Sequence, residues 1–172
     1  MKLAAALCLI GVTAFSQSWV SAVTTNYNRQ KTYLLDSAEV MPEADYGYKL
    51  TPVQRPFSAW FTHTAVMNYN SCSAMKGEAA PAASKGIEEL SKKADIVKAF
   101  KESFDYCDEA LKLMTDEKAT KEIQIGERKV VPATLMVNYV ANLNEHYGNL
   151  VGYMRTKGIT PPSTARAQKK NK

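Results

Sequence analysis

The chain has 172 residues, which is enough for one domain with a substantial hydrophobic core. Hydrophobic residues make up 45% and charged residues 23% of it, which excludes a mostly disordered or collagen-like protein. With three cysteines and two histidines, the chain also cannot form a Cys-rich zinc finger or a disulfide-dense mini-domain.

The first 22 residues have the features of a secretory signal peptide. Lys2 supplies the positive start, residues 3–15 form an uncharged apolar run, and small residues end at Ala22, so we expect cleavage after Ala22. The run is shorter than the roughly 20 residues of a transmembrane helix, although an uncleaved anchor stays an alternative. We therefore expect an exported protein, periplasmic or extracellular, without stable membrane insertion.

Export changes the interpretation of the cysteines. Removal of the signal peptide removes Cys8 and leaves Cys72 and Cys107, an even pair in a compartment where disulfides persist. Two buried free thiols, behaving as small hydrophobic residues, are the alternative. The sequence leaves both states open.

Four stretches carry the spacing of amphipathic helices, and none carries a convincing strand alternation. Gly77 and Gly158 are natural stops for the second and fourth helices, and Pro132 suits the first turn of the fourth. Residues 123–131 are predicted to form a small hairpin or an irregular crossing. The pattern predicts an all-α four-helix bundle over residues 23–162. Its helices are expected at 24–41, 57–76, 96–114 and 132–157.

Residues 163–172 have no apolar pattern, and we expect a disordered basic tail there. The net charge of +5 over the whole chain invites a nucleic-acid interpretation. However, Lys2 would leave with the signal peptide and four further basic residues lie in the tail, so acidic and basic residues balance in the predicted bundle. The charge distribution therefore does not favour a nucleic-acid partner.

Both histidines fall on or beside inward-facing helix stripes. His146 lies on the apolar face of the fourth predicted helix, with Asn142 one turn before it, and His63 lies at the edge of the second helix's stripe. Spacing alone leaves two roles open, hydrogen-bonded structural residues or metal ligands, and transition-metal sites normally use three or more protein ligands. The residues expected to line a pocket beside them are Trp60, Met67, Asn138, Tyr139, Asn149 and Tyr153.

Five segments together form a more specific pattern: MPEADYGYKLTP (41–52), FSAWFTHT (57–64), SAMKGE (73–78), NEHYGNLVGYMR (144–155) and KGITPPS (157–163). They resemble the DinB-like family of DNA-damage-inducible, YfiT-like helix bundles. The first is similar to that family's first connection, the next two to its histidine-bearing helix, and the last two to its metal-binding helix and the turn after it. The resemblance covers nearly the whole predicted mature chain.

The resemblance implies a four-helix bundle that holds a divalent metal, commonly zinc or nickel, on three histidines. One ligand comes from the second helix and two come from an HxxxH pair on the fourth. His63 matches the first ligand and His146 the last, but Asn142 stands at the middle position. An amide is a weaker ligand than imidazole, so we expect a metal site that is weakened, takes a different metal, or binds none.

The resemblance also implies two kinds of activity, transfer to a small thiol and hydrolysis. In both, a metal lowers the pKa of a bound thiol or water and so produces a nucleophile at neutral pH. The leading hypothesis is an exported metal-dependent hydrolase or thiol-transferase-like enzyme acting on a small molecule. The alternatives are a non-catalytic bundle that binds a small molecule in an aromatic pocket, and a structural or interaction role. The sequence leaves a homodimer open.

Overall fold

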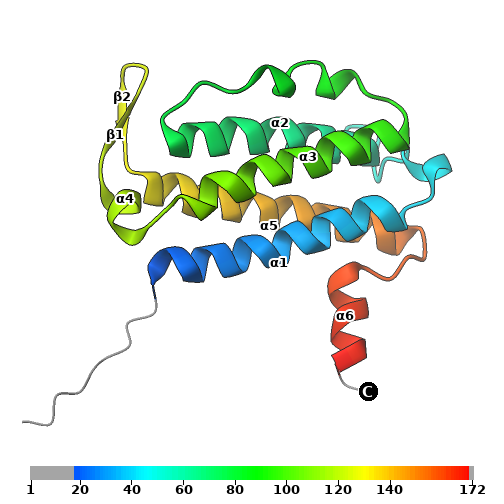
Figure 1. The fold of residues 1–172 in the computed structure, drawn as a ribbon. Helices are drawn as coiled ribbons and strands as arrows, with labels where there is room; N and C mark the ends of the chain where they lie inside the picture. The colour runs from blue at the N-terminus through cyan, green and yellow to red at the C-terminus, as the bar shows by residue number, and fades with distance from the viewer. Residues whose placement is uncertain (1–17, 171–172) are drawn as a thin grey trace, which may run out of the picture.

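Four long helices lie alongside one another and form the body of the molecule (Figure 1). The computed structural model describes residues 18–170, so residues 1–17 of the predicted signal peptide lie outside the described part. No helix within 18–170 is both long and apolar enough to cross a membrane. The helices are α1 (Trp19–Val40), η1 (Glu43–Asp45), α2 (Phe57–Lys76), η2 (Ala82–Ser84), η3 (Ile87–Glu89), α3 (Lys93–Lys112), α4 (Asp116–Thr120), α5 (Pro132–Thr156) and α6 (Pro162–Lys170).

The long helices do not simply alternate in direction. Figure 1 shows α2 and α3 running the same way, with α1 and α5 running the opposite way. The connection between α2 and α3 therefore travels back along the bundle, and it carries η2 and η3. In cross-section α2 packs against α3 and α5, and α1 packs against α5 and α3. The prediction of an all-α four-helix bundle is confirmed.

Local sequence signals fix the ends of the helices that carry the histidines. Helix α2 ends at Lys76 because Gly77 adopts a left-handed conformation with φ of 72°. Pro132 occupies the first turn of α5 as expected. Helix α1 begins at Trp19, before the predicted start, because the Ser18 side chain accepts a hydrogen bond from the backbone N–H of Ser21.

The core is rich in aromatic side chains contributed by all four long helices. Most residues of the predicted stripes are buried, although Trp60, Met67 and Met114 remain partly exposed. Aromatic rings pack against one another across the helices, as Phe61 does against Phe100 with ring centroids 5.3 Å apart. The large, fully buried side chains include Tyr27, Tyr139, Tyr153, Phe57, Phe61, Phe100 and Phe104.

The segment before α5 forms a hairpin, one of the two predicted alternatives. Strands β1 (Ile123–Ile125) and β2 (Arg128–Val130) pair in antiparallel register, and Gly126 in the turn has a φ of 57°. The short helix α4 before it was not predicted, because five residues are too few to show a helical period. Together α4 and the hairpin cover one end of the bundle (Figure 1).

A disulfide joins Cys72 on α2 to Cys107 on α3, with their Cα atoms 5.3 Å apart. Both residues are fully buried. Of the two states that the sequence leaves open, the structure therefore has the bridge, and it joins the two parallel helices near their C-terminal ends.

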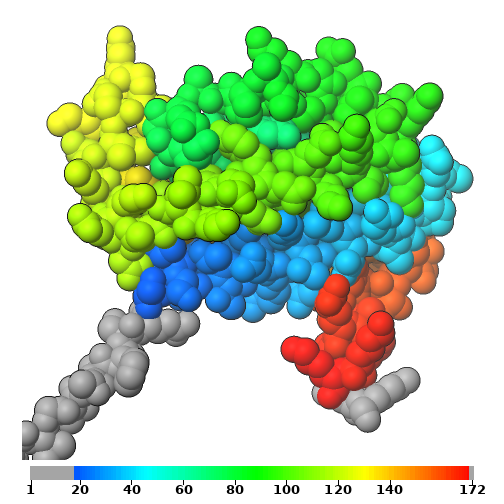
Figure 2. All heavy atoms as spheres, in the orientation of Figure 1, coloured from blue at the N-terminus to red at the C-terminus, as the bar shows by residue number. Residues whose placement is uncertain are grey.

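The prediction of a disordered tail over residues 163–172 is wrong for residues 163–170, which belong to α6. This helix projects from the body beside α1 (Figures 1 and 2). Ser163 binds the Tyr147 hydroxyl through its backbone N–H at 2.9 Å, and Arg166 donates to Asp36 at 2.6 Å. The contacts that hold α6 are mainly polar, which is why an apolar pattern did not reveal it.

Candidate functional site

Three aromatic side chains from two helices meet in the half of the bundle away from the hairpin. Helix α2 contributes Trp60 and His63, and α5 contributes His146. The two imidazole centroids are 5.5 Å apart, and the indole of Trp60 is 5.4 Å from the ring of His146. The two histidines of the chain are therefore brought together, as their helix positions predict.

The hydrogen bonds of Thr64 determine which nitrogen of His146 carries its proton. The Thr64 hydroxyl donates to the carbonyl oxygen of Trp60 at 2.5 Å, as side chains do to the preceding helical turn. The same oxygen lies 3.0 Å from Nδ1 of His146. Because a hydroxyl has a single proton, this oxygen can only accept from Nδ1–H. Neutral His146 consequently carries its free lone pair on Nε2.

His146 is neutral at physiological pH. Its ring is almost fully buried, and burial lowers its pKa to about 4, with further lowering from the nearby His63 and Arg55. Glu145 acts in the opposite direction and outweighs the contribution of Arg55. A neutral imidazole with a fixed Nε2 lone pair can coordinate a cation or accept a hydrogen bond.

His63 is more accessible than His146 and has an acidic neighbour. Its Nδ1 lies 3.6 Å from a carboxylate oxygen of Glu88, which belongs to η3 in the long connection between α2 and α3. This distance is too long for a hydrogen bond, but it places a negative charge beside the imidazole. Glu88 was not among the predicted site residues.

Asn142 does not join the buried group. It precedes His146 by one helical turn on α5, and its side chain belongs to an exposed residue. Four residues advance a helix by about 400°, so the two side chains share a side of α5 but are offset by about 40°. Asn142 is therefore exposed to solvent on a side of α5 where His146 is buried.

Comparison with solved structures identifies the fold. A DinB-like protein from Bacillus cereus ATCC 10987 superposes with a TM-score of 0.69 and 15% identity, over 83% of this chain and 95% of that one. A DinB-like protein from Bacillus subtilis superposes with a TM-score of 0.65 and 19% identity, over 81% of this chain and 93% of that one. A conserved protein from Enterococcus faecalis superposes with a TM-score of 0.64 and 14% identity, over 81% of this chain and 97% of that one. The chain has the DinB-like fold. No family model and no curated protein sequence matches it.

The donor set of this DinB-like bundle fits a metal only in part. His146 Nε2 and the imidazole of His63 are suitable nitrogen ligands, because both belong to rings that lie close together. The remaining position falls to the neutral amide of exposed Asn142. Within residues 18–170, no group of three or more His, Cys, Asp and Glu side chains is close enough to hold an ion. The geometry therefore provides two neighbouring imidazoles, and any further ligands of a metal at this place would have to come from the amide, water or substrate.

Trp60 brings an unpartnered hydrogen-bond donor to the same place. Its indole Nε1–H is buried, and no hydrogen-bond acceptor in the described part of the chain contacts it. The guanidinium of Arg55 lies over the indole, 4.9 Å from the ring centroid. Arg55 precedes α2 in a connection, where helical spacing gives no prediction, and sequence analysis missed it.

The other predicted pocket residues are spread over the bundle. Tyr139 and Tyr153 are core residues, since the first donates to Asn68 and the second to the Arg55 carbonyl. Asn138 is exposed, and Asn149 donates to the Glu145 carbonyl on its own helix. Of the predicted set, Trp60 is the residue whose ring packs against His146, with Met67 about two turns further along α2.

Proposed function

We propose that this protein is an exported small-molecule-handling bundle that binds a divalent metal, zinc or nickel, weakly at His63 and His146. Asn142 would contribute its carbonyl oxygen from the rim of the site. The observation that carries the proposal is the Thr64–His146 contact, because it leaves Nε2 of a neutral, buried imidazole free to bind beside the ring of the other histidine.

A bound metal would supply Lewis acidity, lowering the pKa of a water or thiol so that it acts as a nucleophile at neutral pH. Side chains of the protein would bind and orient the substrate. Arg55 over the Trp60 ring offers a positive charge for an anionic part of a substrate, and the indole N–H offers a hydrogen-bond donor. These features favour hydrolysis or thiol transfer on a small polar molecule over a purely structural role.

The second candidate is a metal-free small-molecule site at the same place. The buried N–H of Trp60, which has no acceptor within residues 18–170, supports it, because such a donor is satisfied when a ligand supplies an acceptor. In this case Nε2 of His146 would accept a hydrogen bond from the ligand instead of binding an ion. The two candidates differ in their response to metal alone.

Calorimetric titration of the untagged protein with Ni²⁺ and Zn²⁺ tests the proposal. We expect weak binding by the wild type, loss of binding in His63→Ala and in His146→Ala, and binding at least tenfold tighter in Asn142→His. The matched control is Asn138→His, which adds an imidazole to an exposed position one further turn away and should leave affinity unchanged.

Two results would overturn the metal proposal. One is a wild type that remains metal-free at millimolar ion while Asn142→His binds, which would favour the second candidate. The other is equal tightening by Asn138→His, because the added histidine would then be acting as a non-specific surface ligand. Circular dichroism of each variant establishes that lost binding does not come from unfolding.

A further inference from the structure

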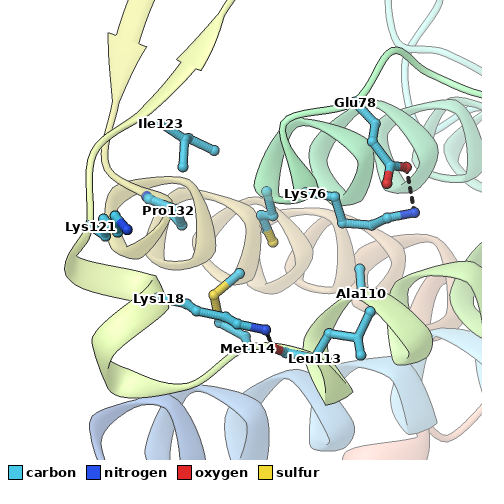
Figure 3. A pocket seen from close by; sticks show the side chains of 10 residues that line it. Lys76, Glu78, Ala110, Leu113, Met114, Lys118, Lys121, Ile123 and Pro132 are labelled. Atoms are coloured by element: carbon cyan, nitrogen blue, oxygen red, sulfur yellow. Dashed lines mark hydrogen bonds and ion pairs between the residues drawn. The ribbon is translucent and has the colours of Figure 1, made fainter.

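A cavity of about 320 Å³ lies at the hairpin end of the bundle, away from the histidines. It is formed where the C-terminal ends of α2 and α3 meet α4, β1 and the start of α5 (Figure 3). Met75 in its wall follows His63 by twelve residues on the same helix, so the two residues are about 18 Å apart along the axis of α2. The cavity is therefore a different place from the candidate functional site.

The walls of the cavity are mainly apolar, and its rim carries ammonium groups. Figure 3 shows Ile123 and Pro132 on one side and Met114, Leu113 and Ala110 on another, with Lys118 beside Met114 and with Lys121 and Lys76 towards opposite edges of the view. A volume near the lower end of the range for ligand pockets suits a small molecule with one short alkyl chain. Apolar walls would bury such a chain favourably.

The charges at the rim do not cancel. Lys76 is neutralised by Glu78, whose carboxylate lies 2.5 Å from its Nζ. Lys118 donates to the backbone carbonyl of Leu113 at 2.9 Å, which leaves its positive charge uncompensated. Neither Lys118 nor Lys121 forms an ion pair with any residue in the part of the chain that the structure describes.

The acidic residues next to these lysines along the chain do not change this balance. Glu117 directly precedes Lys118, but it forms no ion pair within residues 18–170. Glu122 follows Lys121 directly, but it pairs with Lys129 of β2 at 3.1 Å. Asp116 of α4 accepts hydrogen bonds from the backbone N–H groups of Trp19 and Val20. The cavity consequently combines an apolar interior with two uncompensated ammonium groups.

The disulfide makes this wall rigid before any ligand arrives. Cys72 lies one turn before Met75 and Lys76 on α2, and Cys107 lies one turn before Ala110 on α3. The bridge therefore fixes the separation of the two helices directly beside the cavity. A preformed cavity binds with a smaller entropic cost than one that must be assembled.

We propose that this cavity binds a small amphipathic monocarboxylate, such as a fatty acid with a short alkyl chain. The alkyl chain lies against Met75, Met114 and Ile123, and the carboxylate lies at the ammonium groups of Lys118 and Lys121. The proposal is independent of the function proposed for the histidines, because no residue is shared between the two sites.

The first experiment uses octanoate as the probe, with octanol and octylamine as ligands of equal chain length but different charge. Protein labelled with ¹³C at its methionine methyl groups reports the place of binding. We expect octanoate to shift the signals of Met75 and Met114 and to leave Met67, on the histidine half of α2, unchanged. We also expect octanol and octylamine to bind at least tenfold more weakly than octanoate.

Variants test the role of the two ammonium groups. We expect Lys118→Gln with Lys121→Gln to weaken octanoate binding at least tenfold, and Lys121→Gln alone to weaken it by a smaller factor. The matched control, Lys98→Gln with Lys101→Gln, removes the same charge from exposed positions of α3 and should bind octanoate like the wild type.

Three outcomes would overturn the proposal. They are octanol binding as tightly as octanoate, octanoate shifting Met67 in place of Met75 and Met114, and unchanged affinity in the double lysine variant. Absence of any octanoate binding at millimolar concentration would overturn it as well. None of these outcomes bears on the metal titration, so failure here and failure at the histidine site are distinguishable.

Discussion

Thr64 fixes the protonation pattern of His146. Its hydroxyl oxygen, 3.0 Å from Nδ1, has already given its proton to the Trp60 carbonyl and so can only accept. This arrangement, between α2 and α5, leaves the lone pair of a buried imidazole on Nε2. Nearly every metal-binding histidine has such a partner on its other nitrogen.

The first prediction concerns this contact. Thr64→Val keeps the shape of the side chain and removes the acceptor, so the tautomer of His146 is no longer held. We expect Ni²⁺ affinity to fall about 10- to 100-fold, the usual effect of losing such a partner. The matched control is Thr62→Val on the same helix, where within residues 18–170 the hydroxyl donates only to the Ala59 carbonyl, at 3.4 Å. Equal losses in both variants would contradict the assignment.

The second prediction is a pH dependence of stability. The folded pKa of His146, about 4, lies below its ordinary value of 6.5, so between these values the unfolded chain binds a proton that the native protein does not. The contribution to stability is complete above pH 6.5 and is lost as the pH falls towards 4. The slope from this group approaches about 1.4 kcal/mol per pH unit.

Urea unfolding of the metal-free protein at several pH values between about 4 and 7 measures this slope. In His146→Gln the part of the slope due to the buried imidazole should disappear. His63→Gln is the control, since it removes the more accessible imidazole and should keep most of the slope. A wild type and a His146→Gln variant with parallel profiles would show that His146 is not protonated on unfolding.

The third prediction concerns a buried polar network that joins three helices. Tyr139 on α5 donates to the side chain of Asn68 on α2 at 2.8 Å, and Asn68 donates to Ser103 on α3 at 2.9 Å. All three residues are buried. Tyr139→Phe leaves the Asn68 oxygen without its donor, so we expect a loss of about 1–3 kcal/mol in the free energy of unfolding.

Chemical denaturation of Tyr139→Phe measures that loss. Tyr33→Phe is the comparison. Tyr33 is a partly buried tyrosine that packs against Tyr147, and its own hydroxyl has no hydrogen bond in the described part of the chain. Tyr33→Phe should lower the free energy of unfolding much less than Tyr139→Phe does. A Tyr139→Phe variant as stable as Tyr33→Phe would show that the network contributes little.

Helical spacing predicted the parts of the fold and site that lie on long helices. It located α2 and α5, their stops, and the side chains of His63 and His146, because a period of about 3.6 residues fixes which side chains share a face. It could not locate Glu88 or Arg55, since both belong to connections whose path depends on packing between distant segments. It put Asn142 one turn before His146 on the same side of α5, but it did not predict that Asn142 is exposed while His146 is buried.

The lysine-rimmed cavity was missed for the same reason. Lys118 and Lys121 come from α4 and the turn after it, a stretch too short to show a period. The disulfide is an intermediate case. The sequence identified the pair Cys72 and Cys107, but it did not show whether they meet. They meet because α2 and α3 run side by side in the same direction, which brings their Cα atoms to 5.3 Å.

The fourth prediction follows from the length of chain that the disulfide closes. A bridge across 35 residues restricts the unfolded chain, which corresponds to roughly 3–4 kcal/mol of stability. We expect a reductant to lower the melting temperature of the wild type and to leave Cys72→Ser with Cys107→Ser unaffected. Cys8→Ser retains the bridge and should respond to reductant like the wild type. No response in the wild type would mean that the bridge does not form in solution.

The fifth prediction concerns the contacts of Asp116 with the start of α1. Its carboxylate accepts hydrogen bonds from the Val20 backbone and the Ser18 hydroxyl, both at 2.8 Å, and these contacts lower its pKa. The predicted cleavage after Ala22 would remove both partners. Mass spectrometry of the exported protein identifies its first residue and so shows whether these partners are present.

Stability measurements on two forms separate the consequences. In a chain that retains residues 18–22, Asp116→Asn should lower the melting temperature, because the amide is a poorer acceptor than the carboxylate for these donors. In a chain that begins at Val23, the same substitution should have no effect. The pKa of Asp116 is lowered because its carboxylate is paired in the longer chain. As the pH falls and this carboxylate is protonated, the difference in melting temperature between the wild type and Asp116→Asn should therefore vanish. An equal effect in both chains would mean that Asp116 stabilises α4 itself and not the start of α1.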